Sequence, residues 1–280
     1  MSAAKLVRRR VTDVAFKAFC ILVTVLALAA LAAILWSLLS QGLGGINLYV
    51  FTKRTMSTGS HGGLANAIIG SIEMCLLAMV IALTLGVLAG TWLAEYGGNT
   101  PYAQVVRFLN DVLLSAPSIL VGLFVYQILV APFHGYSGYA GAVALAMLAT
   151  PVVTRTTEDI LNLQPSALRE AGMALGASRA FVIRNIMWKS ARTGLVTGGL
   201  LGFARISGET APLIFTSLGN QFMNTHMSQP MASLPTVIYN FGMSAYDDWQ
   251  RLAWVGALLI AIAVLSINII GRVLAREQHR

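Results

Sequence analysis

Charged residues are scarce in this sequence. Asp, Glu, Lys and Arg make up 11% of its 280 residues, whereas hydrophobic residues make up 56%. A soluble globular domain usually carries about 25% charged residues, so the composition excludes an ordinary soluble domain and indicates a membrane protein. We expect the whole chain, residues 1–280, to form a single transmembrane domain of spans and connections, with no separate soluble enzymatic domain.

Cysteine, histidine and nucleotide-binding motifs are also scarce or absent. Cys20 and Cys75 both lie in apolar runs, so we expect buried thiols and no disulfide. The four histidines are scattered, without the spacing of metal ligands, and the sequence predicts no metal site. It also lacks the G-x-x-x-x-G-K-[ST] phosphate-binding loop. We therefore expect this chain to bind no ATP by itself and to hold no cofactor.

Long apolar runs, in contrast, are abundant. A helix needs about 20 apolar residues to cross the hydrocarbon core. The uncharged run from Ala18 to Thr52 is too long for the apolar part of a signal peptide, about 7–15 residues, and predicts an uncleaved first span. The sequence predicts an all-α polytopic membrane protein with six transmembrane helices, at about residues 18–40, 66–94, 112–132, 137–157, 194–217 and 251–272.

The net charge of +8 allows two interpretations, nucleic-acid binding and membrane orientation. The positions of the basic residues favour the second. Most of the 19 lysines and arginines fall in the N-terminal segment, the connection between spans four and five, and the C-terminal segment. Only Lys53, Arg54 and Arg251 fall in the opposite connections. The positive-inside rule then predicts that both termini are cytoplasmic, and we expect no nucleic-acid partner.

The connection over residues 158–192 is far longer than usual connections. From Ser166 it has an amphipathic helical pattern, interrupted at Gly176, with Leu168, Ala171 and Leu175 on one side. Two interpretations fit this pattern. The segment is either a helix lying on the lipid headgroups or an element that docks on a partner protein.

The fifth predicted span, residues 194–217, contains Arg205 near its midpoint and Glu209 four residues later. An arginine at this depth costs about 2.5–3.5 kcal/mol on insertion scales, so it is rarely on the lipid side. A continuous helix places Glu209 about 40° from Arg205. It also places Gly198 and Gly202 on the charged side, which we expect to face protein or water.

The opposite side of that wheel carries the bulky residues Leu200, Phe203 and Ile214, which we expect to meet lipid. The glycines on the charged side form small-xxx-small steps that permit a close helix approach.

The two charges of this span allow two functions. In one, Arg205 offers its planar donor fork to a passing oxyanion, while Glu209 holds the guanidinium and moderates its grip. Ser207 and Thr210 would add hydroxyl contacts along the same substrate pathway. In the other, Arg205 and Glu209 form an i,i+4 ion pair that only locks the helix bundle.

Three further acidic positions are of interest. Glu73 lies inside the second span as a packing carboxylate, a partner for a cation on a second subunit, or part of an outer gate. Asp111 follows Arg107 by four residues, which predicts a boundary ion pair. Glu95 ends the second span at the inner interface, where a charge is unexceptional.

Two stretches resemble a known family. REAGMALGASRAFVIRNIMWKSA is similar to the EAA coupling loop of ABC-importer permeases: Glu170, Ala171 and Gly176 match, and Gly172 replaces the second alanine. ARISGETAPLIFTSLGNQF, with QPMASLPTVIYNF downstream and AEYG at 94–97, resembles the A-type permease subunits of phosphate-specific ABC importers. This second resemblance covers nearly the whole chain and includes Arg205, Ser207, Glu209 and Thr210.

The resemblance implies a type I ABC importer permease in a prokaryotic cell membrane. It implies import of inorganic phosphate by alternating access, with ATP and Mg bound by a separate ATPase that docks on the loop at Glu170, Ala171 and Gly176. Expected partners are a homologous second permease, two ATPase subunits and an extracytoplasmic phosphate-binding protein, although this one chain leaves a homodimer open. The alternatives are an importer of sulfate, molybdate or phosphonate, an ATP-independent anion channel, and a membrane enzyme using Glu73 or Glu209 as a base.

Overall fold

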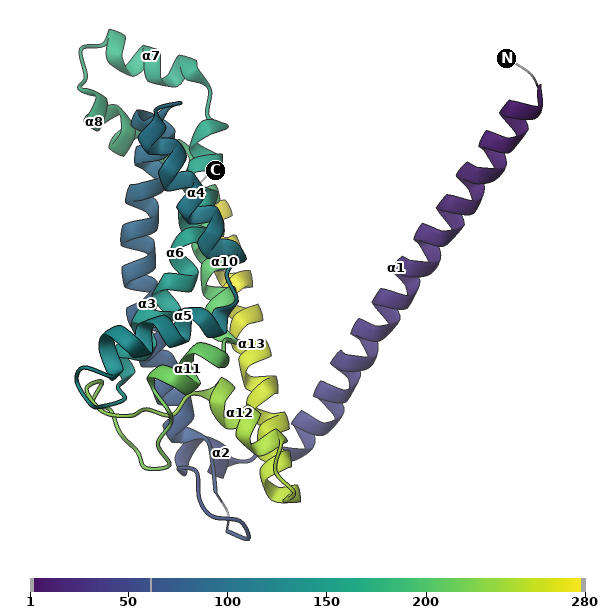
Figure 1. Ribbon diagram of the computed structural model, residues 1–280, viewed down its shortest axis with the longest axis vertical. Coiled ribbons are helices and arrows are strands. Elements are labelled where there is room, and N and C mark those ends of the chain that lie inside the picture. The colour runs from purple at the N-terminus through teal and green to yellow at the C-terminus, as the bar shows by residue number, and fades with distance from the viewer. Residues whose placement is uncertain (1–2, 61, 278–280) are drawn as a thin grey trace.

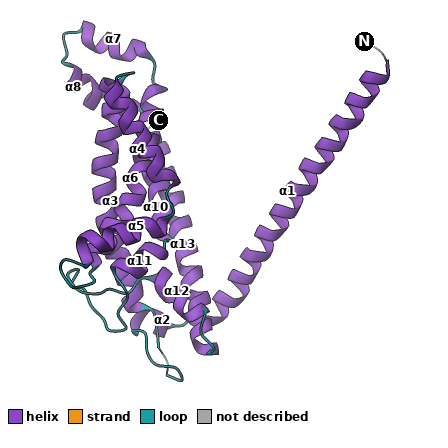
Figure 2. Cartoon of the chain, viewed as in Figure 1, coloured by secondary structure: helices purple, strands orange, loops and turns teal. Residues whose placement is uncertain are grey.

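The chain is a bundle of helices with one long helix standing apart from it (Figure 1). The computed structural model describes residues 3–60 and 62–277, and these residues contain helices and loops but no strand (Figure 2). The predicted all-α class is confirmed. In chain order the elements, with η1 to η3 as single π-helical turns, are α1 (Ala3–Gly45), α2 (Leu48–Thr52), α3 (Ala65–Trp92), η1 (Leu93–Gly97), α4 (Pro101–Ser115), α5 (Ser118–Val125), η2 (Tyr126–Val130), α6 (Gly138–Asn162), α7 (Ser166–Ala174), α8 (Arg179–Val182), η3 (Ile183–Met187), α9 (Trp188–Ser190), α10 (Arg192–Ser207), α11 (Ala211–Thr216), α12 (Leu234–Gly242) and α13 (Asp247–Glu277).

Within the described residues, four helices are long and apolar enough to cross a membrane: α1, α3 continued by η1, α6, and α13. The segment Pro101–Ser115 and the segment Ser118–Val130 pass the same test only as a pair, and they are bent by 105°. The predicted third span, 112–132, therefore runs through a sharp bend. Pro117 explains the bend, because a proline disfavours the helical conformation of the residue before it, and Ala116 is extended. The count of six spans stays a prediction.

Helices α3, α6 and α10 form the centre of the bundle, and glycines allow them to approach closely. A Cβ atom on Gly90 of α3 would lie 2.5 Å from the carbonyl oxygen of Thr154 in α6. A Cβ atom on Gly198 of α10 would lie 2.4 Å from Oγ1 of Thr156, also in α6. The close approach predicted from the glycine spacing of the fifth span is thus confirmed.

Replacing Gly198 by alanine is expected to destabilise the protein by about 1–3 kcal/mol, the usual effect of overpacking a tight contact. The new methyl group would force α10 away from Thr156. The measurement is the thermal unfolding midpoint in detergent, with Gly44→Ala as the control, because nothing lies within 4 Å of a Cβ atom built on Gly44. Equal midpoints for the two variants would contradict the packing argument.

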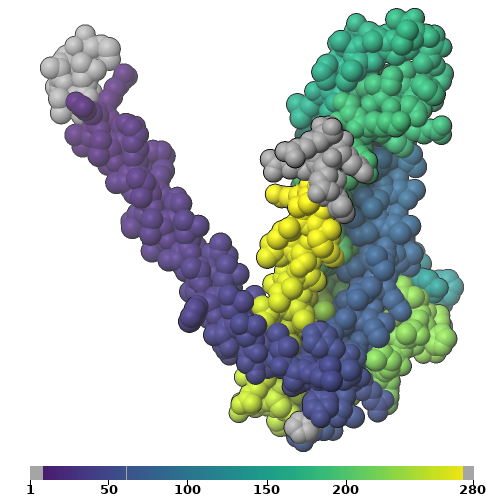
Figure 3. All heavy atoms as spheres, turned by 180° about the vertical axis from the view of Figure 1, so that it is seen from behind, coloured from purple at the N-terminus to yellow at the C-terminus, as the bar shows by residue number. Residues whose placement is uncertain are grey.

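Helix α1 extends away from the bundle for most of its length (Figures 1 and 3). Its residues from Arg9 to Trp36 are all exposed. It meets the rest of the chain near its C-terminal end, where a Cβ atom on Gly42 would lie 2.8 Å from Leu258 of α13. A helix this apolar and this uncovered needs lipid or another protein around it.

The two ends of the bundle differ in character. Helices α7 and α8 lie at one end, together with the beginning of α1 and the last turns of α13 (Figure 1). The connections on either side of α2 and α12 lie at the other end. There the side chain of Asn66 joins two loops, because it accepts a hydrogen bond from the backbone of Thr55 and donates one to the carbonyl of Asn220.

Candidate substrate site and docking element

The helix predicted over residues 194–217 is broken close to Arg205. Helix α10 ends at Ser207, and α11 begins only at Ala211. Glu209 lies in the break between them. The prediction of one continuous helix is therefore wrong, and the wheel that placed Glu209 about 40° from Arg205 does not apply beyond Ser207.

Arg205 lies on the open side of α10. Its side chain is exposed, as is Leu201 one turn earlier, whereas Gly198 and Gly202 on an adjoining side pack against α6. No hydrogen bond or ion pair joins Arg205 to any other residue in the described part of the chain. All five donors of its guanidinium group are thus available to a ligand.

Two of the three bulky residues expected to meet lipid, Leu200 and Phe203, pack against other helices. A Cβ atom on Gly271 of α13 would lie 2.7 Å from Leu200 Cδ1, so Leu200 packs against α13. Phe203 lines an apolar cavity of about 280 Å³ together with residues of α3 and α13. Ile214 belongs to α11, which packs on α5. The expectation of lipid contact is therefore wrong for Leu200 and for Phe203, which packs against core residues of α3 and α6. For Ile214, which is half-buried, it stays a prediction.

Glu209 is half-buried, and the described residues include no ion pair between it and Arg205. Its backbone N–H donates to the carbonyl of Ile206 at 3.2 Å, which closes the end of α10. The hypothesis that a local ion pair merely locks the bundle therefore has no support in this structure.

The two hydroxyl residues of the motif lie on different sides of the break. Ser207 donates to the carbonyl of Phe203 at 2.6 Å and lines the same apolar cavity. Thr210 lines a separate hollow of about 350 Å³ against α12 and α13. The structure therefore places Arg205, Ser207, Glu209 and Thr210 within a short stretch, but it does not gather their side chains around one point.

Glu73 lies in α3 and is half-buried. Its Oε2 atom is buried and has no hydrogen-bond partner among the described residues. A buried carboxyl oxygen without a partner is unusual, because desolvation normally has to be compensated. All three roles expected for Glu73 remain predictions.

The 158–192 connection folds into a compact helical unit, and we call its residues 166–190 the docking element. Glu170 and Ala171, on α7, are both exposed. Gly176 ends α7 with φ of +81°, a left-handed conformation that favours glycine. The N–H of Gly176 donates to Met173, and the N–H of Ala177 donates to Gly172, which together form a Schellman cap.

Packing explains why glycine, and not the second alanine of the EAA pattern, stands at position 172. It is buried beneath α8, and a Cβ atom there would lie 2.8 Å from Val182 Cγ2. A second alanine would push α7 away from α8. The cap at Gly176 and the contact at Gly172 together fold the two helices against each other.

The docking element is amphipathic, although not in the predicted arrangement. Val182 and Met187 are buried with Leu161 of α6, and Leu168 packs against this cluster. Leu175, predicted on the same side as Leu168, is 88% exposed. The difference arises because Leu175 is the C-cap of α7, where the helical periodicity ends.

The outer surface of this region carries several large apolar side chains. Those that are exposed are Leu163, Met173, Leu175 and Phe181. Exposed apolar residues grouped in this way mark surfaces that bind protein or membrane.

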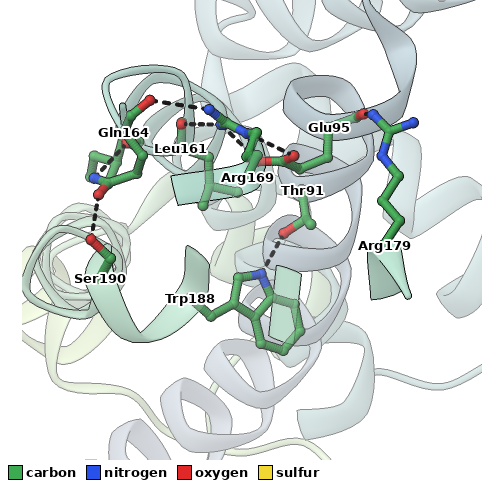
Figure 4. A network of polar contacts seen from close by, with 9 residues as sticks. Thr91, Glu95, Leu161, Gln164, Arg169, Arg179, Trp188 and Ser190 are labelled. Atoms are coloured by element: carbon green, nitrogen blue, oxygen red, sulfur yellow. Dashed lines mark hydrogen bonds and ion pairs between the residues drawn. The ribbon is translucent and has the colours of Figure 1, made fainter. Parts of the chain in front are cut away.

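A network of polar contacts joins the inner side of the docking element to the end of α3 (Figure 4). Glu95, in η1, is only 5% exposed and accepts hydrogen bonds from Nε and Nη2 of Arg169 at 2.8–3.0 Å. Arg179 donates to the backbone carbonyl of Glu95, and its guanidinium lies 4.5 Å from the ring centroid of Tyr96. Trp188 Nε1 donates to Thr91 Oγ1 at 3.1 Å.

Arg107 pairs with a different residue from the one predicted. Its Nε lies 2.6 Å from Glu158 Oε1 in α6, and it donates to the carbonyls of Gly98 and Leu93. Asp111 is exposed and takes no part in this contact. The predicted Arg107–Asp111 pair is wrong. The carboxylate of Glu158 is buried, so water screens its attraction to Arg107 less than it would screen that of the exposed Asp111.

Comparison with known proteins identifies the family. The model for "Binding-protein-dependent transport system inner membrane component" matches residues 82–280, which contain the docking element and Arg205. The chain belongs to this family of transport components. As a member with several apolar helices, it is a multi-pass membrane permease and not an enzyme.

Several relatives of this permease are similar over most of their length. The phosphate transport system permease protein PstA of Pasteurella multocida is 51% identical, with 88% of each chain covered. The probable phosphate transport system permease protein PstA of Methanocaldococcus jannaschii is 38% identical, covering 87% of this chain and 86% of its own. An inward-facing structure of the MetNI methionine ABC transporter superimposes with a TM-score of 0.63 at 19% identity, covering 76% of this permease and 95% of that chain. The last similarity confirms the ABC importer permease fold.

Glu95 is the residue of this permease that sequence reasoning undervalued. It was expected to be an unexceptional charge at the membrane boundary, yet it is buried at the centre of the contacts between α3 and the docking element. Its partner Arg169 is 74 residues away in the sequence, so no local spacing pointed to the pair.

Proposed function

We propose that this permease forms half of the translocation pathway of an ATP-driven importer of inorganic phosphate. Two kinds of observation support the proposal. Relatives that share about 50% sequence identity with most of the chain are named as phosphate transport permeases. The chain itself carries Arg205 on α10, exposed and without a partner among the described residues.

Arg205 is the observation that carries the choice of substrate. A guanidinium group presents donors in a plane that match the oxygens of phosphate, and the low dielectric of the membrane strengthens the contact. Since an unpaired arginine is costly at this depth, a second subunit that closes over the open side of α10 would need an anion there. Two such arginines, one from each permease, would balance a phosphate of charge near −2.

The docking element is the proposed contact with the ATPase. Its exposed face combines Glu170 with Leu175 and Phe181, a mixed surface suited to a groove on another protein. ATP and Mg would be bound by that partner, since this chain has no phosphate-binding loop. The end of the bundle with α7 and α8 would then be cytoplasmic, with both termini on that side, and the opposite end would receive phosphate from an extracytoplasmic binding protein.

The exposed helix α1 fits the same assembly. A homologous second permease would cover it, with membrane lipid around the pair, and two ATPase subunits would dock below. In alternating access, ATP-driven closure of the ATPases opens the permease pair outward. Phosphate then enters and meets Arg205, and hydrolysis resets the pathway inward.

The experiment that tests this function is uptake of labelled phosphate into proteoliposomes that hold the complete complex. We expect uptake to need ATP on the ATPase side and the loaded binding protein outside. Unlabelled phosphate should compete, whereas sulfate, molybdate and a phosphonate at the same concentration should not. Competition by one of these anions instead would assign another oxyanion, and uptake without ATP would assign an anion channel.

A further inference from the structure

We propose that Glu95 is a positioning residue that couples the docking element to helix α3. In this proposal the Glu95–Arg169 ion pair transmits movement of α7 to the transmembrane bundle. The proposal rests on the proposed function, because it assumes that a partner ATPase moves the docking element during transport.

The first support is the geometry of the pair. Arg169 Nε lies 3.0 Å from both carboxylate oxygens of Glu95, and Nη2 lies 2.8 Å from Oε1. The same guanidinium donates to the carbonyl of Gln164 at 3.1 Å and to that of Leu161 at 2.7 Å. Several charge-assisted hydrogen bonds to one guanidinium group fix its orientation relative to the carboxylate as well as the distance between the two groups. One side chain of α7 thus holds the end of α3 and the end of α6 together.

The second support is the position of Arg169 on α7. Arg169 points inward to Glu95, and the next residue, Glu170, is exposed on the proposed ATPase surface. Helix α7 spans 9 residues and is closed by the cap at Gly176, so it can move as one rigid piece. A force applied at Glu170 would reach Glu95 without passing through a flexible loop.

The third support is that two further polar contacts of the docking element meet the same short segment, residues 91–96. Arg179 of α8 binds the backbone of Glu95 and covers the ring of Tyr96, while Trp188 of α9 binds Thr91 (Figure 4). These contacts span little more than one helical turn. The docking element therefore holds the end of α3 at several points, in addition to its contacts with the end of α6.

The end of α3 is suited to receive such a movement. Residues 93–97 form a π-helical turn, a local irregularity that is often found at functional sites and permits a change of helical register. Helix α3 in turn packs tightly on α6, where a Cβ atom on Gly90 would lie 2.5 Å from Thr154. Movement of α3 must consequently involve α6, and with it α10 and Arg205.

The Arg107–Glu158 pair provides a matched control. It lies at the same end of the bundle, with a buried carboxylate and a half-buried arginine, as in the Glu95–Arg169 pair. It joins α4 to α6, however, so both of its members lie outside the docking element. A variant of Glu158 removes a comparable ion pair without cutting the link to the docking element.

The test compares Glu95→Gln with Glu158→Gln in proteoliposomes that contain the whole complex. The readout is phosphate taken up per ATP hydrolysed, with the amount of ATPase that co-purifies measured on the same preparations. For Glu95→Gln we expect unchanged co-purification and a roughly tenfold lower ratio, within the usual range for removing a residue that couples two sites. For Glu158→Gln we expect an unchanged ratio, because a structural defect lowers uptake and hydrolysis in proportion.

A second pair of variants guards against a folding defect. Arg169→Lys keeps the charge and loses the fork, so its ratio should be intermediate. Exchange of the two side chains, Glu95→Arg with Arg169→Glu, should restore part of the ratio. A wild-type ratio in Glu95→Gln, loss of the ATPase from it, or an equal change in Glu158→Gln would overturn the proposal. Absence of phosphate uptake by the wild-type complex would instead refute the proposed function.

Discussion

Replacing Arg205 by glutamine is expected to lower phosphate uptake about 100-fold or more, while the complex with the ATPase still assembles. Loss of a charged hydrogen-bonding partner for a desolvated anion typically costs about 2–5 kcal/mol, and about 2.7 kcal/mol already corresponds to 100-fold. The side chain of Arg205 is exposed and binds no other side chain among the described residues. Glutamine at this position therefore breaks no contact within the chain, and the fold should tolerate it. The measurement is the initial rate of labelled phosphate uptake, with co-purification of the ATPase as the measure of assembly.

Two variants make this result specific. Arg205→Lys keeps the charge but not the planar fork, so uptake should be reduced by less than in the glutamine variant. Arg192→Gln removes an exposed arginine from the first turn of the same helix, far from the break, and should leave uptake nearly unchanged. Uptake at the wild-type rate in Arg205→Gln would remove Arg205 from the substrate pathway.

Replacing Gly176 by arginine is expected to release most of the ATPase from the membrane. Gly176 has φ of +81°, and a residue with a Cβ atom in the left-handed region is strained by about 1–2 kcal/mol. The strain would loosen the cap that folds α7 against α8, and the long side chain would project from the exposed docking surface. The measurement is the amount of ATPase that co-purifies with the permease from membranes. Deletion of residues 170–187 should have the same effect.

Gly59 offers the matched control for this variant. It has φ of +77°, and, as at Gly176, nothing lies within 4 Å of a Cβ atom built there. It sits at the opposite end of the bundle, so Gly59→Arg carries the same backbone strain and should keep the ATPase bound. Asparagine tolerates the left-handed conformation better than other residues, so Gly176→Asn should retain most of the binding. Equal loss in Gly176→Arg and Gly59→Arg would show that general instability, and not the docking surface, explains the result.

Local patterns predicted the features that depend on neighbouring residues. The glycine spacing of α10 predicted a close approach to another helix, because residues four apart lie on one side of a helix. The structure shows that this helix is α6. The interruption at Gly176 predicted the turn between α7 and α8, because glycine readily adopts positive φ. The two predictions needed no knowledge of the partner helix.

Continuity of a helix was harder to predict. The apolar pattern predicts one helix through residue 217, but α10 ends at Ser207. Gly208 and Pro212 marked the break in the sequence, since glycine weakens a helix interior and proline is tolerated only in the first turn. Hydrophobicity on both sides of the break concealed it. The error changed the expected neighbours of Glu209 and the expected direction of Ile214, which lie beyond the break.

Contacts between distant residues escaped prediction altogether. Spacing suggested that Arg107 binds Asp111 four residues later, yet its partner is Glu158, 51 residues away. Glu95 and Arg169 are separated by 74 residues. In both pairs the carboxylate is buried, and burial strengthens an ion pair relative to one on an exposed helix face.

The sequence by itself determined that this chain is an all-α membrane protein, that it lacks the phosphate-binding-loop motif, and that its long loop carries a helical pattern interrupted at Gly176. These properties follow from the amino-acid composition and from the spacing of apolar residues within one segment, so they do not depend on how the segments pack together. The tertiary structure decided which side of α10 stays open for Arg205, and that Glu95 joins α3 to the docking element. Both depend on how α3, α6 and α13 surround other segments, since burial and long-range pairing arise only when distant parts of the chain pack together.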